Sequence, residues 1–352
     1  MLELAPNRFA FCEITEKILR DLTDDSVAVL DDEPSIDSSD SGESSESNDS
    51  RTGESVLSRK EMHLAMLAAV ALPPIGIAVA MVLLWGGWFG WSSLIAMVVM
   101  YILTGLGVTI GYHRLFAHKA FATPTPIGVF FMILGGMSAQ GPLVWWVATH
   151  RRHHHFSDHE MDPHSPHAGF SNGIIMRTVG FLHAHIGWLF TSTADNNYEY
   201  VPDLLANPTV MRINRLFPLW VALGLAIPGI VCGIITMSWM GVVLGVLWGG
   251  LARMFLLHHA TWSINSVCHV WGWRDYRSDD HSRNNPVMGV LSFGEGWHNN
   301  HHAFPTSARH GLKWWQLDIS WIVIRSLQSI GLASKVRLPT QERMAARRRI
   351  AP

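Results

Sequence analysis

Four long apolar stretches limit what this chain can fold into. In lipid, a segment has to satisfy its own backbone hydrogen bonds, so a stretch of roughly 20 apolar residues crosses a bilayer as a helix. We therefore expect an all-α integral membrane protein with four transmembrane helices. They are expected at about residues 63–85, 90–111, 215–236 and 239–260.

The links within each pair of stretches are short enough to be turns. GGWFGW joins the first pair and TMSWM the second, so the four helices should form two hairpins. Neither link contains Lys or Arg, whereas Arg51, Arg59 and Lys60 precede the first stretch and the chain after Arg309 is strongly basic. By the positive-inside rule, both chain ends and the long middle loop face the cytoplasm.

Composition divides the chain into three parts. Residues 1–58 are rich in Asp, Glu and Ser and cannot bury enough apolar surface to order themselves, so we interpret them as a disordered acidic tail. Residues 59–335 are expected to form the membrane-embedded domain, and residues 336–352 a basic C-terminal tail.

Histidines next to the apolar stretches are the second informative feature. The spacing i, i+3, i+4 occurs twice and places three imidazoles on one face of a helix, with Cβ atoms roughly 5–6 Å apart. Another pair is five residues apart, which a regular helix would separate by roughly 140°, so that pair should straddle a helix end. The groups are His113 and His118; His150, His153 and His154; and His298, His301 and His302, with His269 following Asn265 by four residues.

Imidazole is a ligand that suits Fe, Zn and Cu, and these groups hold more neutral nitrogens than one ion can bind, so two metal ions are implied. Other histidines are interpreted as hydrogen-bonded polar residues or as neighbours outside the spacing, and His164, in Asp162-Pro163-His164, stays ambiguous. The first kind comprises His63, His167, His183, His281 and His310, and the second His155, His159, His258 and His259.

A fifth apolar stretch, about residues 126–147, is interrupted by Gly-Gly and by Gln140-Gly141-Pro142. If it crossed the membrane, the first and second histidine groups would lie on opposite faces. Ligands of one metal centre have to share a face, so this stretch is expected to be re-entrant or buried. All the histidine groups then belong to a helical domain that caps the membrane helices on the cytoplasmic side.

Taken together, these motifs resemble the integral-membrane acyl desaturases of the stearoyl-CoA and bacterial Δ9 type. The resemblance runs from about residue 60 to 335. Its segments are Gly111-Tyr-His113-Arg-Leu-Phe-Ala-His118, Trp146 to His154, Phe156-Ser157-Asp158, Asp162-Pro163-His164, His185-Ile-Gly187-Trp188, Thr261 to His269 and Gly294-Glu-Gly-Trp-His298-Asn-Asn-His301-His302.

The resemblance implies a di-iron centre held by nine histidines, with Asn265 reaching one iron through water and no separate side-chain acid or base. It implies reduction of O2 to water while adjacent methylenes of a saturated acyl chain lose hydrogen, which leaves a cis double bond near carbon 9. The implied ligands are His113, His118, His150, His153, His154, His269, His298, His301 and His302.

The resemblance also implies a closed, bent tunnel that keeps the acyl chain in register and the oxidant away from water. By family position, Gln140, Trp146 and Thr261 match the kink of this tunnel. Tyr101 and Gly105 match its closed end, where side-chain size would limit chain length.

Two features of the sequence need to be considered beside the resemblance. Acyl-CoA members carry polar and charged residues before the second histidine group, where this chain has Val147-Ala148-Thr149 and, upstream, Gly141. Acyl-CoA, acyl-lipid and acyl carrier protein substrates therefore stay open, with the first two favoured. Arg253, inside the fourth apolar stretch, would be costly in lipid and is expected to turn toward the site or the cytoplasmic interface.

Electrons have to come from a partner protein. Cys12, Cys232 and Cys268 are too few for an iron–sulfur cluster with four thiolates, and they indicate no disulfide framework. A ferredoxin or a cytochrome b5 is implied, and the basic C-terminal tail could dock an acidic one. No nucleic-acid partner is expected.

Two other functions fit some of these features. An acyl or alkane hydroxylase on the same scaffold begins with the same hydrogen abstraction, but the continuous match through Asn265 and His269 favours desaturation. A transition-metal transporter would also cluster histidines near membrane helices. Transporters place ionisable residues near the bilayer midplane, whereas these histidines lie outside the apolar stretches.

Overall fold

The computed structural model describes residues 59–88, 90–170, 173–191 and 198–349. The chain divides into the compact units Met1–Thr52 and Gly53–Pro352, and the described residues all belong to the second. The expected acidic tail, residues 1–58, lies outside the described residues. Helices and isolated β-bridges make up the described part, with no β-strand in it, which confirms the all-α class.

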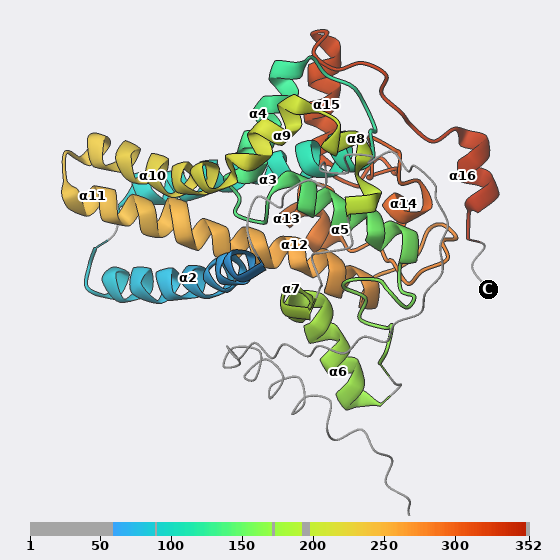
Figure 1. The fold of residues 1–352 in the computed structure, drawn as a ribbon, viewed down its shortest axis with the longest axis horizontal. Coiled ribbons are helices and arrows are strands. Elements are labelled where there is room, and N and C mark those ends of the chain that lie inside the picture. Colours follow the sequence, from blue (N-terminus) through green and yellow to red (C-terminus); the bar gives the residue numbers. More distant parts are fainter. Residues whose placement is uncertain (1–58, 89, 171–172, 192–197, 350–352) are drawn as a thin grey trace, which may run out of the picture. The chain divides into compact units, whose positions relative to one another are not determined.

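The helices are joined by both short turns and longer connections, the longest at residues 157–173, 271–285 and 304–318 (Figure 1). In the first half of the chain they are α2 (Arg59–Trp85), α3 (Trp91–Leu106), η1 (Gly107–Ala117), α4 (Thr125–Gly136), α5 (Leu143–Phe156), α6 (Ile174–Leu182), η2 (His183–Gly187) and α7 (Trp188–Thr191). In the second half they are η4 (Tyr198–Tyr200), α8 (Pro202–Leu205), α9 (Pro208–Arg215), α10 (Phe217–Thr236), α11 (Trp239–Leu244), η5 (Gly245–Ala252), α12 (Arg253–Val270), α13 (Pro286–Leu291), α14 (His298–Ala303), α15 (Ile319–Ser329) and α16 (Gln341–Arg347). The elements η1, η2 and η5 are π-helical, and η4 is a 3-10 turn.

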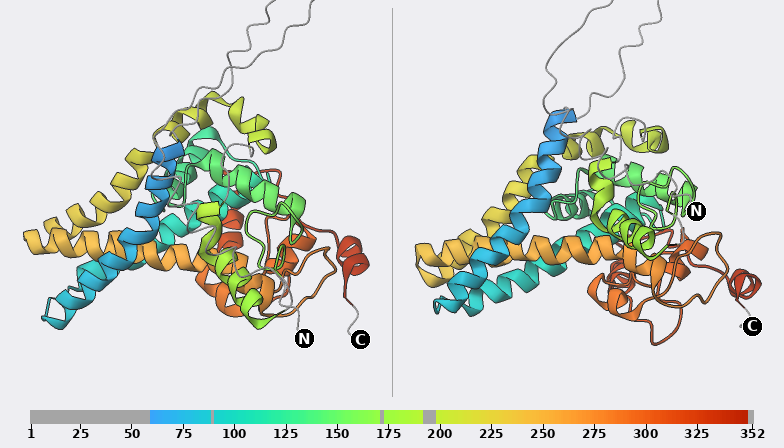
Figure 2. Two further views of the ribbon diagram at one scale, coloured as in Figure 1. Left: turned by 60° about the horizontal axis from the view of Figure 1, so that its bottom comes forward. Right: turned by 90° about the horizontal axis from the view of Figure 1, so that it is seen from below.

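Four of these helical segments are long and apolar enough to cross a membrane, as expected. Large apolar side chains such as Val82, Ile95 and Ile234 remain exposed on them, which suits contact with lipid. Figures 1 and 2 show the long helices extending to one side of the shorter helices that follow α12. The four segments are Met66–Trp85, Trp91–Ala117, Phe217–Thr236 and Trp239–Val270.

The second and fourth segments are longer than a bilayer requires. They contain 27 and 32 residues, so at 1.5 Å per residue they reach about 40 and 48 Å, against a hydrocarbon core of about 30 Å. His113 and His269 lie near the far ends of these two segments. The excess length therefore carries both histidines beyond the part of the helix that a bilayer would cover.

The interrupted stretch 126–147 is not one helix. Its first part, α4, has 12 residues and a length of about 18 Å, too short to cross a bilayer. The chain turns at Gly141, whose φ of +101° suits glycine, and a Cβ there would lie 2.5 Å from Trp145 Cε3. Pro142 then caps the start of α5. The expectation that this stretch does not span is confirmed.

Arg253 stabilises the helix packing and is turned away from the lipid-facing surface. Its side chain is fully buried and donates to the carbonyls of Gly249 (3.2 Å), Met137 (2.9 Å) and Gly224 (2.9 Å). The Gly224 carbonyl would normally bond the N–H four residues later, but that residue is Pro228, which has none. The guanidinium therefore takes the place of the missing donor.

An apolar core cluster joins η1 to α5. Tyr112 of η1 packs with Val144, Val147 and Ala148 of α5, and all four side chains are buried. Thr149 is buried as well. This packing holds the first histidine pair beside the second histidine group.

Candidate metal centre and cavity

The first histidine pair is aligned by the π-helical turn that ends η1. The His118 N–H donates to the His113 carbonyl at 3.1 Å, which is an i to i+5 bond. His118 is the first residue after η1, so the pair straddles a helix end, as the spacing predicts. The wider turn brings both rings to one side, with ring centroids 4.8 Å apart.

The predicted ligands gather in two groups of ring nitrogens. Within each group, one nitrogen of every histidine lies within 4.8 Å of the others. Each triplet contributes to both groups, because its i, i+4 pair joins one group and its i+3 member joins the other. Group one consists of His113, His118, His150, His154 and His301, and group two of His153, His269, His298 and His302.

The Nε2 atoms of group one face one another. His118 Nε2 lies 3.1 Å from His113 Nε2 and 2.8 Å from His150 Nε2. His301 Nε2 lies 3.1 Å from His113 Nε2 and 2.9 Å from His154 Nε2. Nitrogens that share one metal ion at bonds of about 2.1 Å and right angles lie about 3 Å apart, so this spacing fits a metal site.

Carboxylates hold three of the four rings in group two. In each case Nδ1 faces a carboxylate oxygen and Nε2 faces the centre of the group, which is the outer layer typical of metal-bound histidines. The pairs are His153 with Asp162 (3.0 Å), His269 with Asp158 (2.8 Å) and His302 with Asp280 (2.5 Å).

These three carboxylates favour the binding of a cation in group two. A neutral histidine that donates Nδ1–H to a carboxylate carries a lone pair on Nε2. The Nε2 atoms of His153 and His302, whose Nδ1 atoms both face carboxylates, lie 3.3 Å apart. A metal ion bound by both would use lone pairs that would otherwise face each other, so the residues present fit a metal.

Group one has a different outer layer. Glu295 Oε2 lies 2.6 Å from His113 Nδ1 and 3.2 Å from His310 Nδ1, and Glu295 Oε1 lies 3.1 Å from Arg114. Arg114 is fully buried and also pairs with Asp318 at 3.0 Å. One carboxylate thus connects a predicted ligand to a buried arginine.

The surroundings of His298 and His301 favour the neutral imidazole, and those of Asp280 favour the charged carboxylate. Burial and the neighbouring histidines hold the pKa of His298 and of His301 well below the usual range. Burial alone would raise the pKa of Asp280, but His302 outweighs it, and the pKa lies well below its ordinary value. These are the protonation states that metal binding requires.

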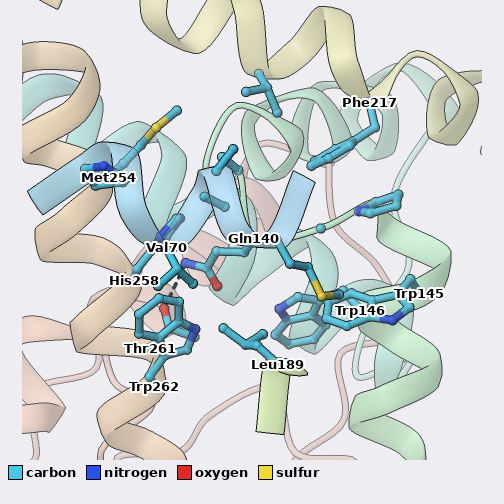
Figure 3. Close-up of a pocket in the computed structure, with 18 of the residues that line it drawn as sticks. Val70, Gln140, Trp145, Trp146, Leu189, Phe217, Met254, His258, Thr261 and Trp262 are labelled. Atoms are coloured by element: carbon cyan, nitrogen blue, oxygen red, sulfur yellow. Dashed lines mark hydrogen bonds between the residues drawn. The ribbon is translucent and has the colours of Figure 1, made fainter. Parts of the chain in front are cut away.

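A cavity of about 370 Å³ leads to the histidines, and its walls are mostly apolar (Figure 3). Gln140, Trp146 and Thr261 line it together. The Gln140 amide donates to Thr261 Oγ1 at 3.0 Å, the dashed line in Figure 3. His150 of group one forms part of the same wall.

A second cavity of about 50 Å³ is adjacent to the first. The residues that line both are Trp146, His150, Thr261 and Asn265. The wall of the second cavity also includes Gly105 and histidines from both groups. Asn265 therefore borders the histidine groups and the space beside them. Tyr101 lines neither cavity, and its hydroxyl donates to the Leu291 carbonyl at 2.7 Å.

Several residues of this site were not identified from the sequence. Asp280 lies outside the quoted motifs, and Glu295 lies within the Gly294 to His302 segment but was not identified as a partner of a histidine. The rule that ligating histidines need outer carboxylates is the signal that points to them. His310, expected to be an ordinary core histidine, lies with its ring 4.4 Å from that of His301. Phe293 was missed as well, although it lines the smaller cavity.

Other histidines behave as expected. His167 Nε2 bonds the His269 carbonyl at 3.0 Å, and His258 Nε2 bonds the Ser138 carbonyl at 2.9 Å. His164 lies beside His153 and Asp162, at the edge of group two. The side chain of His63 lies outside the part that the structure describes.

An apolar cavity that ends at two groups of histidines suits a membrane oxidoreductase acting on a long apolar substrate. A metal transporter instead needs polar groups near the midplane of its spans. The sequence comparisons agree with the enzyme: residues 90–327 match the fatty acid desaturase family. The chain belongs to this family and is a desaturase, an oxidoreductase of lipid metabolism.

Relatives of known activity differ in the carrier of their acyl chain. A hex-5-enoyl-[acyl-carrier protein] acetylenase of Moorena producens is 45% identical over 79% of this chain and 87% of its own length. Delta-9 acyl-lipid desaturase 1 of Arabidopsis thaliana is 39% identical over 75% of this chain and 80% of its own. An acyl-CoA C20 Delta5-desaturase of Anemone leveillei is 37% identical over 72% of this chain and 76% of its own length.

Proposed function

We propose that this enzyme introduces a cis double bond near carbon 9 of a long saturated acyl chain, with reduction of O2 to water. The observation that carries this proposal is the apolar cavity of about 370 Å³ that reaches His150 and Asn265. Its volume is in the range of about 300–1,000 Å³ usual for ligand pockets. The Δ9 position rests on the resemblance and on the Arabidopsis relative.

The nine histidines of groups one and two would hold two iron ions, and Asn265 would approach one of them through water. Bound iron would supply the activation of O2 and the removal of hydrogen. For three of the nine ligands, His153, His269 and His302, a carboxylate at Nδ1 orients the ring so that Nε2 faces the centre of group two. No separate side-chain acid or base is proposed.

The cavity residues would hold the acyl chain in register. The Gln140–Thr261 bond and the Trp146 ring fix the wall next to His150, where the chain would bend. Gly105 and Tyr101, which lie on the same helix, would form the closed end of the acyl tunnel. Apolar walls exclude water from the reacting methylenes, which protects the oxidising centre.

An acyl-lipid is the favoured carrier, with acyl-CoA as the alternative. The 27 residues that line the larger cavity include no Lys or Arg, which a CoA phosphate would need. Val147, Ala148 and Thr149 are buried in the core, so this segment offers no surface to a head group. Acyl carrier protein remains a further candidate because of the Moorena relative.

We also propose that the four helices cross the membrane as two hairpins, with both chain ends and the helical metal domain in the cytoplasm. Residues 59–335 would form the desaturase domain. An external ferredoxin or cytochrome b5 would supply electrons, with the basic segment 336–352 as a docking surface for an acidic donor.

Expression in a desaturase-deficient host, followed by gas chromatography–mass spectrometry of its fatty acids, tests the proposal. We expect a new monounsaturated acid with its double bond at carbon 9, and none from a His298→Ala variant. A hydroxylated product without new unsaturation would show that the hydroxylase reaction is correct instead.

A further inference from the structure

The two histidine groups differ in the charge that lies behind them. In the described part of the chain, Asp158, Asp162 and Asp280 have histidines as their ionic partners. Glu295, behind His113 of group one, is shared with Arg114. Group two thus has three carboxylates beside its histidines, with Arg274 as the nearby cation that interacts with Asp158 and Asp280. The single carboxylate of group one shares Arg114 with Asp318, so less negative charge lies behind group one.

The three aspartates are themselves held in place. Asp158 accepts the His281 N–H at 2.8 Å and the Ser165 hydroxyl at 2.7 Å. Asp280 accepts the Ser282 N–H at 3.0 Å. Asp162 accepts the Asp158 N–H at 2.8 Å, which couples two of the carboxylates. Fixed carboxylates restrict the rings of group two to one orientation and one tautomer.

Burial separates the groups as well. All four histidines of group two are buried, whereas His118, His150 and His154 of group one are half-buried. An ion leaving group one therefore has a shorter path to water. A polar cavity of about 480 Å³ is lined by His154 of group one and also by His302 of group two, so it does not distinguish the groups.

The number of ligands acts in the opposite direction, because group one offers five nitrogens and group two four. One more neutral imidazole adds a single bond. A lost outer-layer carboxylate typically costs about 10–100-fold in metal affinity, and group two has three of them. The charge and the burial should therefore outweigh the extra ligand.

We propose that group two is the high-affinity metal site and that group one releases its ion first, with Asp158, Asp162 and Asp280 as positioning residues. This inference rests on the proposed function, because it takes the histidine groups to be metal sites. It predicts that the two ions differ in affinity, although the side chains that bind them directly are all histidines.

The wild-type holoenzyme provides the first test. The purified full chain, loaded with 57Fe, is exposed to excess EDTA, and iron per chain is followed by mass spectrometry. We expect one ion to leave quickly and the second at least about tenfold more slowly. Mössbauer spectra of the half-depleted protein should show one of two quadrupole doublets, the one assigned to group two.

Variants assign each phase to its group. Asp280→Asn keeps an oxygen for the His302 N–H but removes the charge, so it should speed the slow phase by about 10–100-fold. Glu295→Gln should change the fast phase alone. Asp279→Asn is the matched control, because Asp279 is the exposed neighbour of Asp280 and carries the same charge.

Asp158→Asn serves as a second group-two variant if Asp280→Asn does not fold, with the unfolding temperature of the metal-free protein as the folding check. A single release rate in the wild type, or a slow phase unchanged by both aspartate variants, would overturn the inference. A wild type that takes up no iron would refute the proposed function as well, which distinguishes the two failures.

Discussion

A Cβ atom on Gly105 would lie 2.2 Å from Cε2 of Phe293, so the Phe293 ring occupies the space next to position 105. The same ring lies with its centroid 5.6 Å from that of Tyr101. Phe293 therefore closes the smaller cavity at the place where the resemblance predicts the end of the acyl tunnel. The glycine is needed because the aromatic ring comes from another segment.

Removing the Phe293 ring should lengthen the accepted acyl chain. The φ of Phe293 is +56°, a conformation that favours glycine, so Phe293→Gly removes the ring without adding backbone strain. We expect the products of the variant to shift toward longer chains, measured by gas chromatography–mass spectrometry of host lipids. Phe130→Ala, at an exposed aromatic position on α4, is the control and should leave the product lengths unchanged.

An unchanged chain-length profile in Phe293→Gly, with normal total activity, would contradict this role. Gly105→Ala gives a second measurement, because its Cβ would push the ring toward the metal groups. It should reduce turnover of the longest substrates first.

The sequence was sufficient for the parts of the fold that depend on local pattern. Stretches of about 20 apolar residues identify the four long helices, and the i, i+3, i+4 spacing identifies which histidines share a face. The break at Gly141 and Pro142 separates α4 from α5 for a local reason, since glycine and proline fix the turn.

Long-range contacts could not be predicted in this way. Asp280 meets His302 across 22 residues, and Arg114 meets Glu295 across 181. Nothing near either residue in the sequence indicates its partner. The partners of Arg253 could not be predicted either, because one of them is a carbonyl that Pro228 leaves unpaired on a different helix.

Arg253 should therefore contribute to stability rather than to chemistry. Arg253→Met leaves three buried carbonyls without this donor, and each such loss costs about 1–3 kcal/mol. We expect a lower unfolding temperature in detergent, with Arg253→Lys intermediate because one ammonium cannot reach all three oxygens. Arg325→Met, at an exposed arginine bonded to Gln328, is the control. Normal unfolding of Arg253→Met would contradict the role.

His310 should make the metal-free protein sensitive to acid. Burial and the nearby Arg114 lower the pKa of His310 from 6.5 to about 4. Between these values the unfolded chain takes up a proton that the folded chain does not, so stability falls as pH falls, by about 1.4 kcal/mol per pH unit.

His310→Gln removes this titration and should flatten the fall in unfolding temperature between pH 6.5 and pH 4.5. His159→Gln, at an exposed histidine, is the control and should keep the wild-type slope. Parallel curves for the wild type and His310→Gln would show that other buried histidines account for the acid sensitivity.

The walls of the larger cavity lead to a prediction about the substrate's carrier. Val70 of α2 and Phe217 of α10 both line it, and both helices are long enough to span the membrane. An acyl chain could then enter from the bilayer while its head group stays among the lipids. In proteoliposomes with reductant and O2, we expect a labelled stearoyl lipid to be desaturated without free CoA. Labelled stearoyl-CoA should stay saturated in the same vesicles, because they hold no acyltransferase to move its acyl chain onto a lipid. Formation of unsaturated acyl-CoA, or a requirement for acyl carrier protein, would contradict entry from the membrane.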